Sequence, residues 1–339
     1  MFMKELYAYL RLGAGTLLPF LLFLLPALFL RPGTEEETPL PEPTVTVTVT
    51  VTAAPASAPE EPRVTLLTDS GTWELGLEEY LFGVVAAEMP AAFPPEALKA
   101  QAVAARTDTV RRMGSSPHPP GTCCADPGCC RAWLPDTALR ERWGADYDRW
   151  ASVIRQAVEE TAGTVLLYQG EPILAVFHAC SPGSTEASEN VWLEALPYLR
   201  SVSSPETADS VPEYYSTVEF SWEELRRVAL KAVPEADLSG PEEDWLSGAE
   251  YTESGRLRRV MLGGAELTGS GLRMLLGLRS AAFTWTCGTE GIRFSVRGYG
   301  HGVGMSQYGA RQMALDGADW QEILAHYYPG AVPGSLDQA

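Results

Sequence analysis

An uncharged, apolar segment of 19 residues near the N-terminus, residues 12–30, limits the possible architectures of this chain most strongly. Its length matches what a helix needs to cross the hydrocarbon core of a bilayer. Lys4 and Arg11 precede the segment, whereas Glu35 and further acidic residues follow it. Because basic residues stay on the cytoplasmic side, the pattern predicts a cytoplasmic tail over 1–11 and a transmembrane helix over 12–30.

The resulting expectation is a single-pass protein of the cell membrane whose C-terminal domain lies outside the cytoplasm. A cleaved signal peptide is the alternative, although the apolar region of such peptides is shorter and no small-residue cleavage site follows Leu30. Residues 31–63 are rich in Pro, Glu, Thr and Ala and contain no aromatic residue. This composition is typical of an extended linker.

Residues 64–333 have the pattern of a folded domain. Helical spacing of apolar residues is found over 77–89 and 95–114, and short apolar runs typical of strands include 163–168. Pro90 ends the first of these helices, because proline cannot continue the hydrogen-bond ladder. Helices and strands interleave without a regular alternation, so the sequence predicts a single α+β domain with a substrate cleft.

The charge balance excludes one broad class of partner. The chain has 25 Lys and Arg against 44 Asp and Glu, a formal net charge of −19. Unspecific nucleic-acid binding depends on clustered basic residues that release phosphate counterions. A nucleic-acid partner is therefore not expected.

Glu88 is the first candidate for chemistry. It continues the apolar stripe of the helix predicted over 77–89 and lies in its last turn. The helix dipole there disfavours a carboxylate anion, and burial acts in the same direction. A carboxyl group that stays protonated is what a glycosidic leaving oxygen requires of a general acid. A surface glutamate at a helix end is the alternative.

Lys99 and Arg106 are seven residues apart on the next predicted helix and so share one face. Opposite an acid, a cationic face indicates a polar groove for a ligand with carboxylates or many hydroxyls. A solvated helix face is the alternative interpretation. Ser181 lies in the turn after the apolar run that ends at His178. It could be a nucleophile with His178, but no GxSxG motif surrounds it, so its hydroxyl is expected to lie in the ligand groove instead.

Four cysteines crowd into eight positions, in a segment without periodicity. Three thiolates and one imidazole satisfy tetrahedral Zn²⁺, and His118, Cys124, Cys129 and Cys130 provide this set, with Cys123 left over. Disulfides between the two cysteine pairs are the alternative, because the predicted compartment is oxidising. The sequence leaves both open. The glycines of 297–314 also allow close approach of the backbone to a ligand or another segment.

Three blocks of sequence carry a resemblance to a known family. They are EEYLFGVVAAEMPAAFPPEALKAQAVAARTDT, FHACSPGSTEASENVWLEALPYLRSV and GHGVGMSQYGARQMA with the later ILAHYYPG, which together span residues 78–330. In these blocks the chain resembles stage II sporulation protein D, a family of membrane-anchored lytic transglycosylases used in engulfment during spore formation.

The resemblance implies a role for individual residues. Glu88 falls on the catalytic acid of the family, Lys99 and Arg106 on its groove cations, and Tyr198 on its groove aromatic. A His/Cys cluster that binds zinc in sporulation homologues falls on His118, Cys124, Cys129 and Cys130. Cys129 replaces a histidine of that cluster, and the family's serine-double-glycine turn has Pro182 in its second place.

The resemblance also implies a reaction, cleavage of peptidoglycan between N-acetylmuramic acid and N-acetylglucosamine to give a 1,6-anhydromuramoyl end. The implied substrate is a glycan strand without stem peptides, and the implied partners are a sporulation amidase and the stage II sporulation proteins P and M. No second carboxylate is evident at a spacing that would suit a hydrolase with two acids. The alternative is a non-catalytic amidase enhancer, which shares these blocks and stimulates a cell-wall amidase.

Overall fold

The structure is a computed structural model that describes residues 62–115, 118–119, 121–126, 128–192 and 194–338. The predicted tail, transmembrane helix and almost all of the linker lie outside these ranges. No helix within them is long and apolar enough to cross a membrane. The longest, α2 (Pro95–Ser115), has 21 residues but carries charged side chains along its length. The described residues form a mixed α+β chain with several sheets, as predicted. The predicted fold class is corrected in one respect, since no described helix supports the transmembrane anchor that it included.

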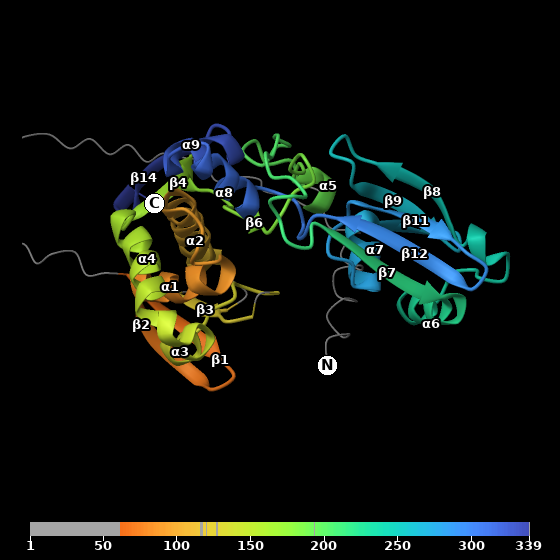
Figure 1. Ribbon diagram of the computed structural model, residues 1–339, viewed down its shortest axis with the longest axis horizontal. Coiled ribbons are helices and arrows are strands. Elements are labelled where there is room, and N and C mark those ends of the chain that lie inside the picture. The colour runs from red at the N-terminus through yellow and green to blue at the C-terminus, as the bar shows by residue number, and fades with distance from the viewer. Residues whose placement is uncertain (1–61, 116–117, 120, 127, 193, 339) are drawn as a thin grey trace, which may run out of the picture. The chain divides into compact units, whose positions relative to one another are not determined.

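The described residues belong to one compact unit that contains two hydrophobic cores. The first core surrounds α2, which contacts α1, α4, α8, α9 and β4 (Figure 1). Small alanine side chains at positions such as Ala97 and Ala105 let neighbouring elements approach α2 closely. The helices of this part are α1 (Leu77–Glu88), α2, α3 (Asp136–Trp143), α4 (Tyr147–Glu160), α5 (Glu189–Trp192), α8 (Gln307–Leu315) and α9 (Trp320–Tyr327), with the 3₁₀ turns η1 (Gly144–Asp146) and η3 (Leu336–Gln338).

Three small sheets accompany these helices. Strand β1 pairs antiparallel with β2 and parallel with β3, β4 pairs antiparallel with β14 and β5, and β13 pairs parallel with β6. Their bounds are β1 (Arg63–Thr68), β2 (Gly71–Gly76), β3 (Thr122–Cys124), β4 (Thr164–Tyr168), β5 (Glu171–Pro172), β6 (Phe177–His178), β13 (Met305–Ser306) and β14 (Val332–Ser335). Because β3 pairs with β1, the first two cysteines of the cysteine-rich segment are held in a sheet.

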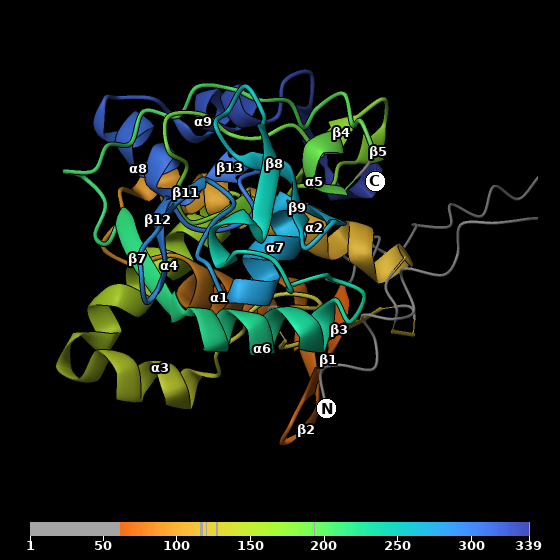
Figure 2. The ribbon, with the colours of Figure 1, turned by 90° about the vertical axis from the view of Figure 1, so that its right-hand side faces the viewer.

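The second core is enclosed by two antiparallel sheets, β10-β9-β8 and β11-β12-β7, and by α6 and α7 (Figure 2). In β12, Ile292, Phe294 and Val296 alternate with exposed residues, so the buried face of the strand points into this core. The elements are β7 (Tyr215–Ser221), α6 (Trp222–Ala232), η2 (Glu242–Asp244), β8 (Leu246–Tyr251), β9 (Leu257–Leu262), β10 (Ala265–Thr268), α7 (Gly269–Leu276), β11 (Phe283–Cys287) and β12 (Gly291–Arg297).

Buried polar contacts connect residues that follow β6 with the β8–β9 turn. Thr252 and Ser254 both donate to a carboxylate oxygen of Glu186, at 2.6 Å each. Arg256 donates to the carbonyl of Ser184 at 2.9 Å. Because Glu186, Ser254 and Arg256 are almost completely buried, these groups depend on one another for hydrogen bonds.

Candidate functional site

Glu88 is the last residue of α1, as predicted. Met89 after it is extended, which agrees with the restriction that Pro90 places on the preceding residue. The carboxylate accepts a hydrogen bond from the backbone N–H of Ala132 at 3.2 Å. Burial raises the pKa of Glu88 above its ordinary value, although Arg131 and the Ala132 N–H act in the opposite direction. The group therefore resists ionisation more than a surface glutamate does.

A cavity of about 280 Å³ opens beside Glu88. Three tyrosines, two glutamates, an arginine and a glutamine line it beside smaller apolar residues, a set suited to a sugar with its apolar ring faces and hydroxyl rim. The lining residues are Glu88, Pro90, Ala179, Cys180, Val211, Pro212, Glu213, Tyr214, Arg279, Gly298, Tyr299, Gln307 and Tyr308. These residues come from distant parts of the chain. Some of them adjoin the first core and others the second, so the cavity lies where the two groups meet.

Gln307, the first residue of α8, holds the end of α1 in place. Its amide donates to the backbone carbonyl of Glu88 at 3.2 Å and to the side-chain oxygen of Gln101 at 3.3 Å. Gln101 and Gln307 are both buried. This contact satisfies a carbonyl at a helix end, where no partner exists within the helix.

Asp108 of α2 organises the other side of Glu88. It is fully buried and forms ion pairs with Arg112 at 2.6 Å and with Arg131 at 2.8 Å. The Arg131 guanidinium also lies over the ring of Phe177, 4.2 Å from its centroid. Asp108 thus fixes the segment that carries Arg131 and Ala132 against the carboxyl group of Glu88.

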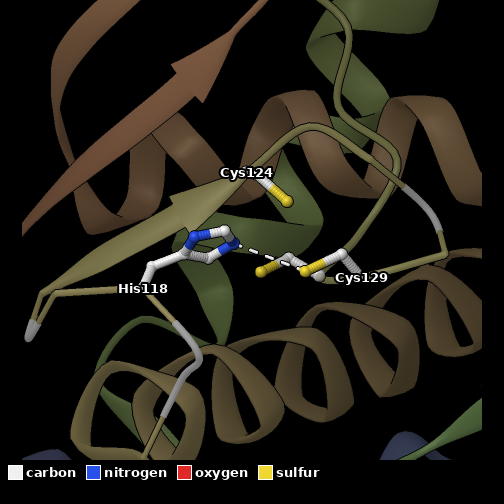
Figure 3. A group of neighbouring side chains, drawn as sticks. His118, Cys124 and Cys129 are labelled. Atoms are coloured by element: carbon white, nitrogen blue, oxygen red, sulfur yellow. Dashed lines mark hydrogen bonds between the residues drawn. The ribbon is translucent and has the colours of Figure 1, made fainter. Parts of the chain in front are cut away.

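The four residues predicted to bind metal lie together. One donor atom from each of His118, Cys124, Cys129 and Cys130 falls within 4.8 Å of the other three. His118 Nε2 and Cys129 Sγ are 3.4 Å apart (Figure 3). Ligands at Zn²⁺ distances of about 2.0–2.3 Å in a tetrahedron lie about 3.3–3.8 Å from one another, so the donor set suits this ion.

Local hydrogen bonds explain why the segment folds this way. Cys129 and Cys130 both donate their backbone N–H groups to the carbonyl of Asp126, at 3.0 and 2.9 Å. The side chain of Asp126 accepts from the N–H of Gly128 at 2.8 Å. This turn brings the two cysteines back toward Cys124 on β3. All six cysteines of the chain are free thiols in the structure.

Lys99 and Arg106 are not brought to the cavity of Glu88. Arg106 is fully buried and pairs with Glu78 through two hydrogen bonds of 2.5 and 2.9 Å. Lys99 forms ion pairs with Glu96 at 2.8 Å and with Glu160 at 2.7 Å. The shared helix face was predicted, but neighbouring glutamates already satisfy both cations. A fully buried Arg106 does not fit the predicted contact with a polymer.

Tyr198 and Ser181 are also buried. The Tyr198 hydroxyl accepts from the N–H of Leu174 at 3.3 Å. The Ser181 hydroxyl lies 2.6 Å from His178 Nε2 and receives a hydrogen bond from Arg256 at 3.2 Å. Ser181 has no exposed surface. Its position corrects the expectation of a hydroxyl directed into the groove, because that hydroxyl joins an internal network.

Sequence reasoning missed Glu213, Arg279 and the tyrosines that line the cavity. A signal was present for Tyr299 and Tyr308, which lie in the glycine-rich segment 297–314. Gly298 of this segment has φ +73°, and a Cβ there would lie 2.8 Å from the carbonyl oxygen of Cys180. The close approach of the two backbones requires glycine and brings the tyrosines to the cavity.

Comparisons with known proteins agree with the sequence blocks. Residues 71–168 match the family model described as Stage II sporulation protein (SpoIID). The chain is 40% identical over 257 residues to stage II sporulation protein D of Bacillus amyloliquefaciens, covering 75% of this chain and 73% of that protein. It is 39% identical over 264 residues to the protein of the same name from Bacillus subtilis (strain 168), covering 77% and 75%.

A third relative has a different name. The amidase enhancer of Bacillus subtilis (strain 168) is 31% identical over 308 residues, which cover 74% of this chain and 39% of that protein. The similarity to the two proteins named stage II sporulation protein D extends over about three quarters of every chain compared. The chain therefore belongs to the stage II sporulation protein D family, a family of sporulation proteins.

Proposed function

We propose that this protein is a peptidoglycan lytic transglycosylase in which Glu88 is the general acid and base. The observation that carries the proposal is the position of Glu88, whose carboxyl group lines a cavity and has a pKa raised by burial. A raised pKa keeps more of the carboxyl group protonated at a given pH, and the protonated form is the one that donates to a glycosidic oxygen. The aromatic lining of the cavity suits a sugar ring.

In the proposed reaction, Glu88 gives its proton to the oxygen between N-acetylmuramic acid and N-acetylglucosamine as the bond from C1 to that oxygen breaks. N-acetylglucosamine leaves with a free hydroxyl. The C6 hydroxyl of the muramoyl residue then attacks its own C1, and the Glu88 carboxylate accepts the proton of that hydroxyl. The product is a 1,6-anhydro ring, and Glu88 is protonated again.

A second carboxylate, Glu213, lines the same cavity, which the spacing in the sequence did not indicate. Glu213 is paired with Arg279 and is largely exposed, whereas Glu88 is half-buried and carries the raised pKa. This difference favours Glu88 as the proton donor. Hydrolysis with a water molecule as nucleophile is the competing reaction, and the product distinguishes the two.

The cluster of side chains formed by His118, Cys124, Cys129 and Cys130 is proposed to hold one Zn²⁺. Four protein ligands leave no open position, so the ion would supply a cross-link within the loop. The next two residues along the chain, Arg131 and Ala132, face Glu88. The cluster would thus stabilise the segment on which the carboxyl group of Glu88 rests.

The Glu88→Gln variant tests the proposal. Incubated with peptide-free glycan strands, the wild-type chain should release anhydromuramoyl ends, which weigh one water less than hydrolytic products in mass spectrometry. General acid catalysis contributes about 10²–10⁴-fold, so the variant should lose at least about 100-fold in rate. Glu79→Gln, an exposed glutamate of the same helix, should retain wild-type activity. Reducing ends only, or equal rates for both variants, would contradict the assignment.

The second candidate function is that of an amidase enhancer, favoured by the 31% identity to the protein of that name. Under this alternative the chain alone releases no glycan fragments but raises the rate of an added cell-wall amidase. The preference for peptide-free strands proposed for the transglycosylase requires an amidase that acts first. We therefore propose such an amidase and the stage II sporulation proteins P and M as partners, and action outside the cytoplasm, where peptidoglycan lies.

A further inference from the structure

The cavity beside Glu88 contains a cation with no part in the proposed proton transfers. Among the described residues that line it, Arg279 is the only lysine or arginine. We infer that Arg279 binds the lactyl carboxylate of the muramoyl residue at the scissile bond and so selects glycan strands without stem peptides. The inference rests on the proposed function and assigns its specificity to one side chain.

The surroundings of Arg279 hold its guanidinium at the cavity wall. Its carbon Cζ lies 4.4 Å from the ring centroid of Tyr299, a cation–π contact. Its backbone carbonyl accepts from the N–H of Gly300 at 2.9 Å. The planar guanidinium offers paired donors that match the two oxygens of a carboxylate.

The present partner of Arg279 is a carboxylate that a ligand can replace. Glu213 pairs with Arg279, but 74% of the Glu213 side chain and 30% of the Arg279 side chain are exposed. Exposed ion pairs of this kind are weak. Glu213 has φ +54°, an uncommon conformation for a residue other than glycine that is often found at ligand clamps. A carboxylate on the substrate would occupy the place that Glu213 holds in its absence.

The chemistry of the substrate determines which carboxylate this is. The sugars of the glycan carry acetamido and hydroxyl groups, and the lactyl group at C3 of the muramoyl residue is their acidic substituent. This group is a free carboxylate only after the stem peptide has been removed, because the peptide is joined to it as an amide. Its ring also contains the C1 at which cleavage occurs, so Glu88 and Arg279 would contact the same residue. With a net charge of −19, the chain needs a local cation to bind an anionic strand.

The test compares two forms of one peptide-free glycan, with free lactyl carboxylates and with the same carboxylates converted to methylamides. A hydrogen-bonded charge pair corresponds to about 10- to 100-fold in affinity. The wild-type full-length chain should therefore cleave the free-acid strand with a kcat/KM about 10- to 100-fold above that for the amide. Arg279→Gln should bring the ratio near one by lowering the rate on the free acid alone, and Arg279→Lys should restore part of it.

Two further variants complete the design. Glu213→Gln removes the internal competitor and should tighten binding of the free-acid strand. Arg293→Gln breaks a comparable exposed pair, that with Glu219, away from the cavity and should leave the ratio unchanged. Equal rates of the wild-type chain on both strands, or an unchanged ratio in folded Arg279→Gln, would overturn the inference.

Binding separates this inference from the proposed function. Affinities of the Glu88→Gln chain for the two strands are measured without cleavage. A preference for the free acid that disappears in the Glu88→Gln, Arg279→Gln double variant supports the inference even if the wild-type chain proves unable to cleave. Equal affinities for both strands in a wild-type chain that does cleave would overturn the inference alone and leave the proposed function intact.

Discussion

The carboxyl group of Glu88 has surroundings that oppose its ionisation. Burial raises its pKa, and the N–H of Ala132 with the charge of Arg131 offsets only part of that effect. A carboxyl group whose pKa is higher in the folded chain contributes stability that is complete below the unfolded value. That contribution is lost as pH rises through the folded value. The proposed chemistry therefore has a cost in stability near neutral pH.

The Glu88→Gln variant makes this cost measurable. Glutamine stays uncharged, so the Tm of the variant should rise relative to wild type as pH increases above about 4.5. Thermal unfolding followed by circular dichroism between about pH 4 and pH 8 measures the difference. At the acid end both side chains are uncharged, which provides the control. A difference that stays constant over the whole range would show that burial does not oppose the charge.

Arg106 is a second residue whose role depends on its environment. Its guanidinium pairs with Glu78 and also donates to the carbonyls of Val158 and Thr164, at 3.1 and 3.2 Å. These contacts join α1, α2 and β4. They indicate a structural contribution in place of the predicted contact with substrate.

Arg106→Ala should lower the free energy of unfolding by about 3 kcal/mol, because it leaves the partly buried carboxylate of Glu78 and two backbone carbonyls without their cationic donor. Lys99→Ala, in a more exposed pair, should cost less than about 1 kcal/mol. Urea unfolding at neutral pH measures both changes. If the Arg106→Ala chain has wild-type stability but a raised KM, Arg106 binds substrate as first predicted.

At the scale of elements, the segment between α2 and α3 connects the cluster of His118 and the three cysteines to Glu88. Arg112, in the last turn of α2, donates to the carbonyl of Cys129 at 3.2 Å and pairs with Asp108. Leu134 donates its N–H to the carbonyl of Gly83 on α1 at 3.3 Å. Apart from β3, the described residues of this segment have little regular structure, so their arrangement depends on such contacts and on the proposed ion.

Protein purified without chelator should contain about one Zn²⁺ per chain by elemental analysis. Cys124→Ser should lose the ion and expose the loop to proteolysis, because three ligands no longer close the cluster. Cys287→Ser, at an exposed cysteine of β11, should keep a full complement of zinc. A metal-free wild-type chain in which the cluster cysteines resist thiol reagents would support disulfides instead.

At the scale of the whole molecule, Glu186 connects the segment after β6 with the β8–β9 turn. Burial alone would raise the pKa of Glu186, but hydrogen bonds from Ser254, Thr252 and Asn190 lower it overall. A carboxyl group with a lowered pKa contributes stability above its unfolded value. This contribution is lost as pH falls through the folded value.

Glu186→Gln should reduce the free energy of unfolding at neutral pH by about 1–3 kcal/mol, since its donors lose a charged acceptor. The deficit should shrink as pH falls below about 4.5, where the wild-type carboxylate becomes protonated. Denaturant titrations at several pH values, followed by tryptophan fluorescence, measure the effect. Glu189→Gln, which removes the charge from a nearby and more exposed ion pair with Arg200, is the control and should change the free energy of unfolding less. Equal stability of Glu186→Gln and wild type at neutral pH would contradict this role.

Local patterns in the sequence predicted several features of the described chain. Apolar spacing and Pro90 predicted the helix that ends at Glu88, because a helix stripe and a proline stop are properties of neighbouring residues. The crowding of His118, Cys124, Cys129 and Cys130 predicted a cluster, because short spacing keeps these side chains within reach of one another. The choice between zinc and disulfides depends on whether the thiols bind a metal ion or are oxidised, and the spacing of the residues does not determine this.

The tertiary structure alone decided which residues share a cavity with Glu88. Glu213, Arg279 and Tyr299 lie more than 100 positions from it in the sequence, and only the packing of the two cores brings them beside Glu88. In the same way, the helix pattern placed Lys99 and Arg106 on one face, but the glutamates that pair with them come from other elements or another turn. The periodicity of a sequence predicts which face of a helix a side chain occupies. The partner opposite that face is a long-range contact, and packing determines it.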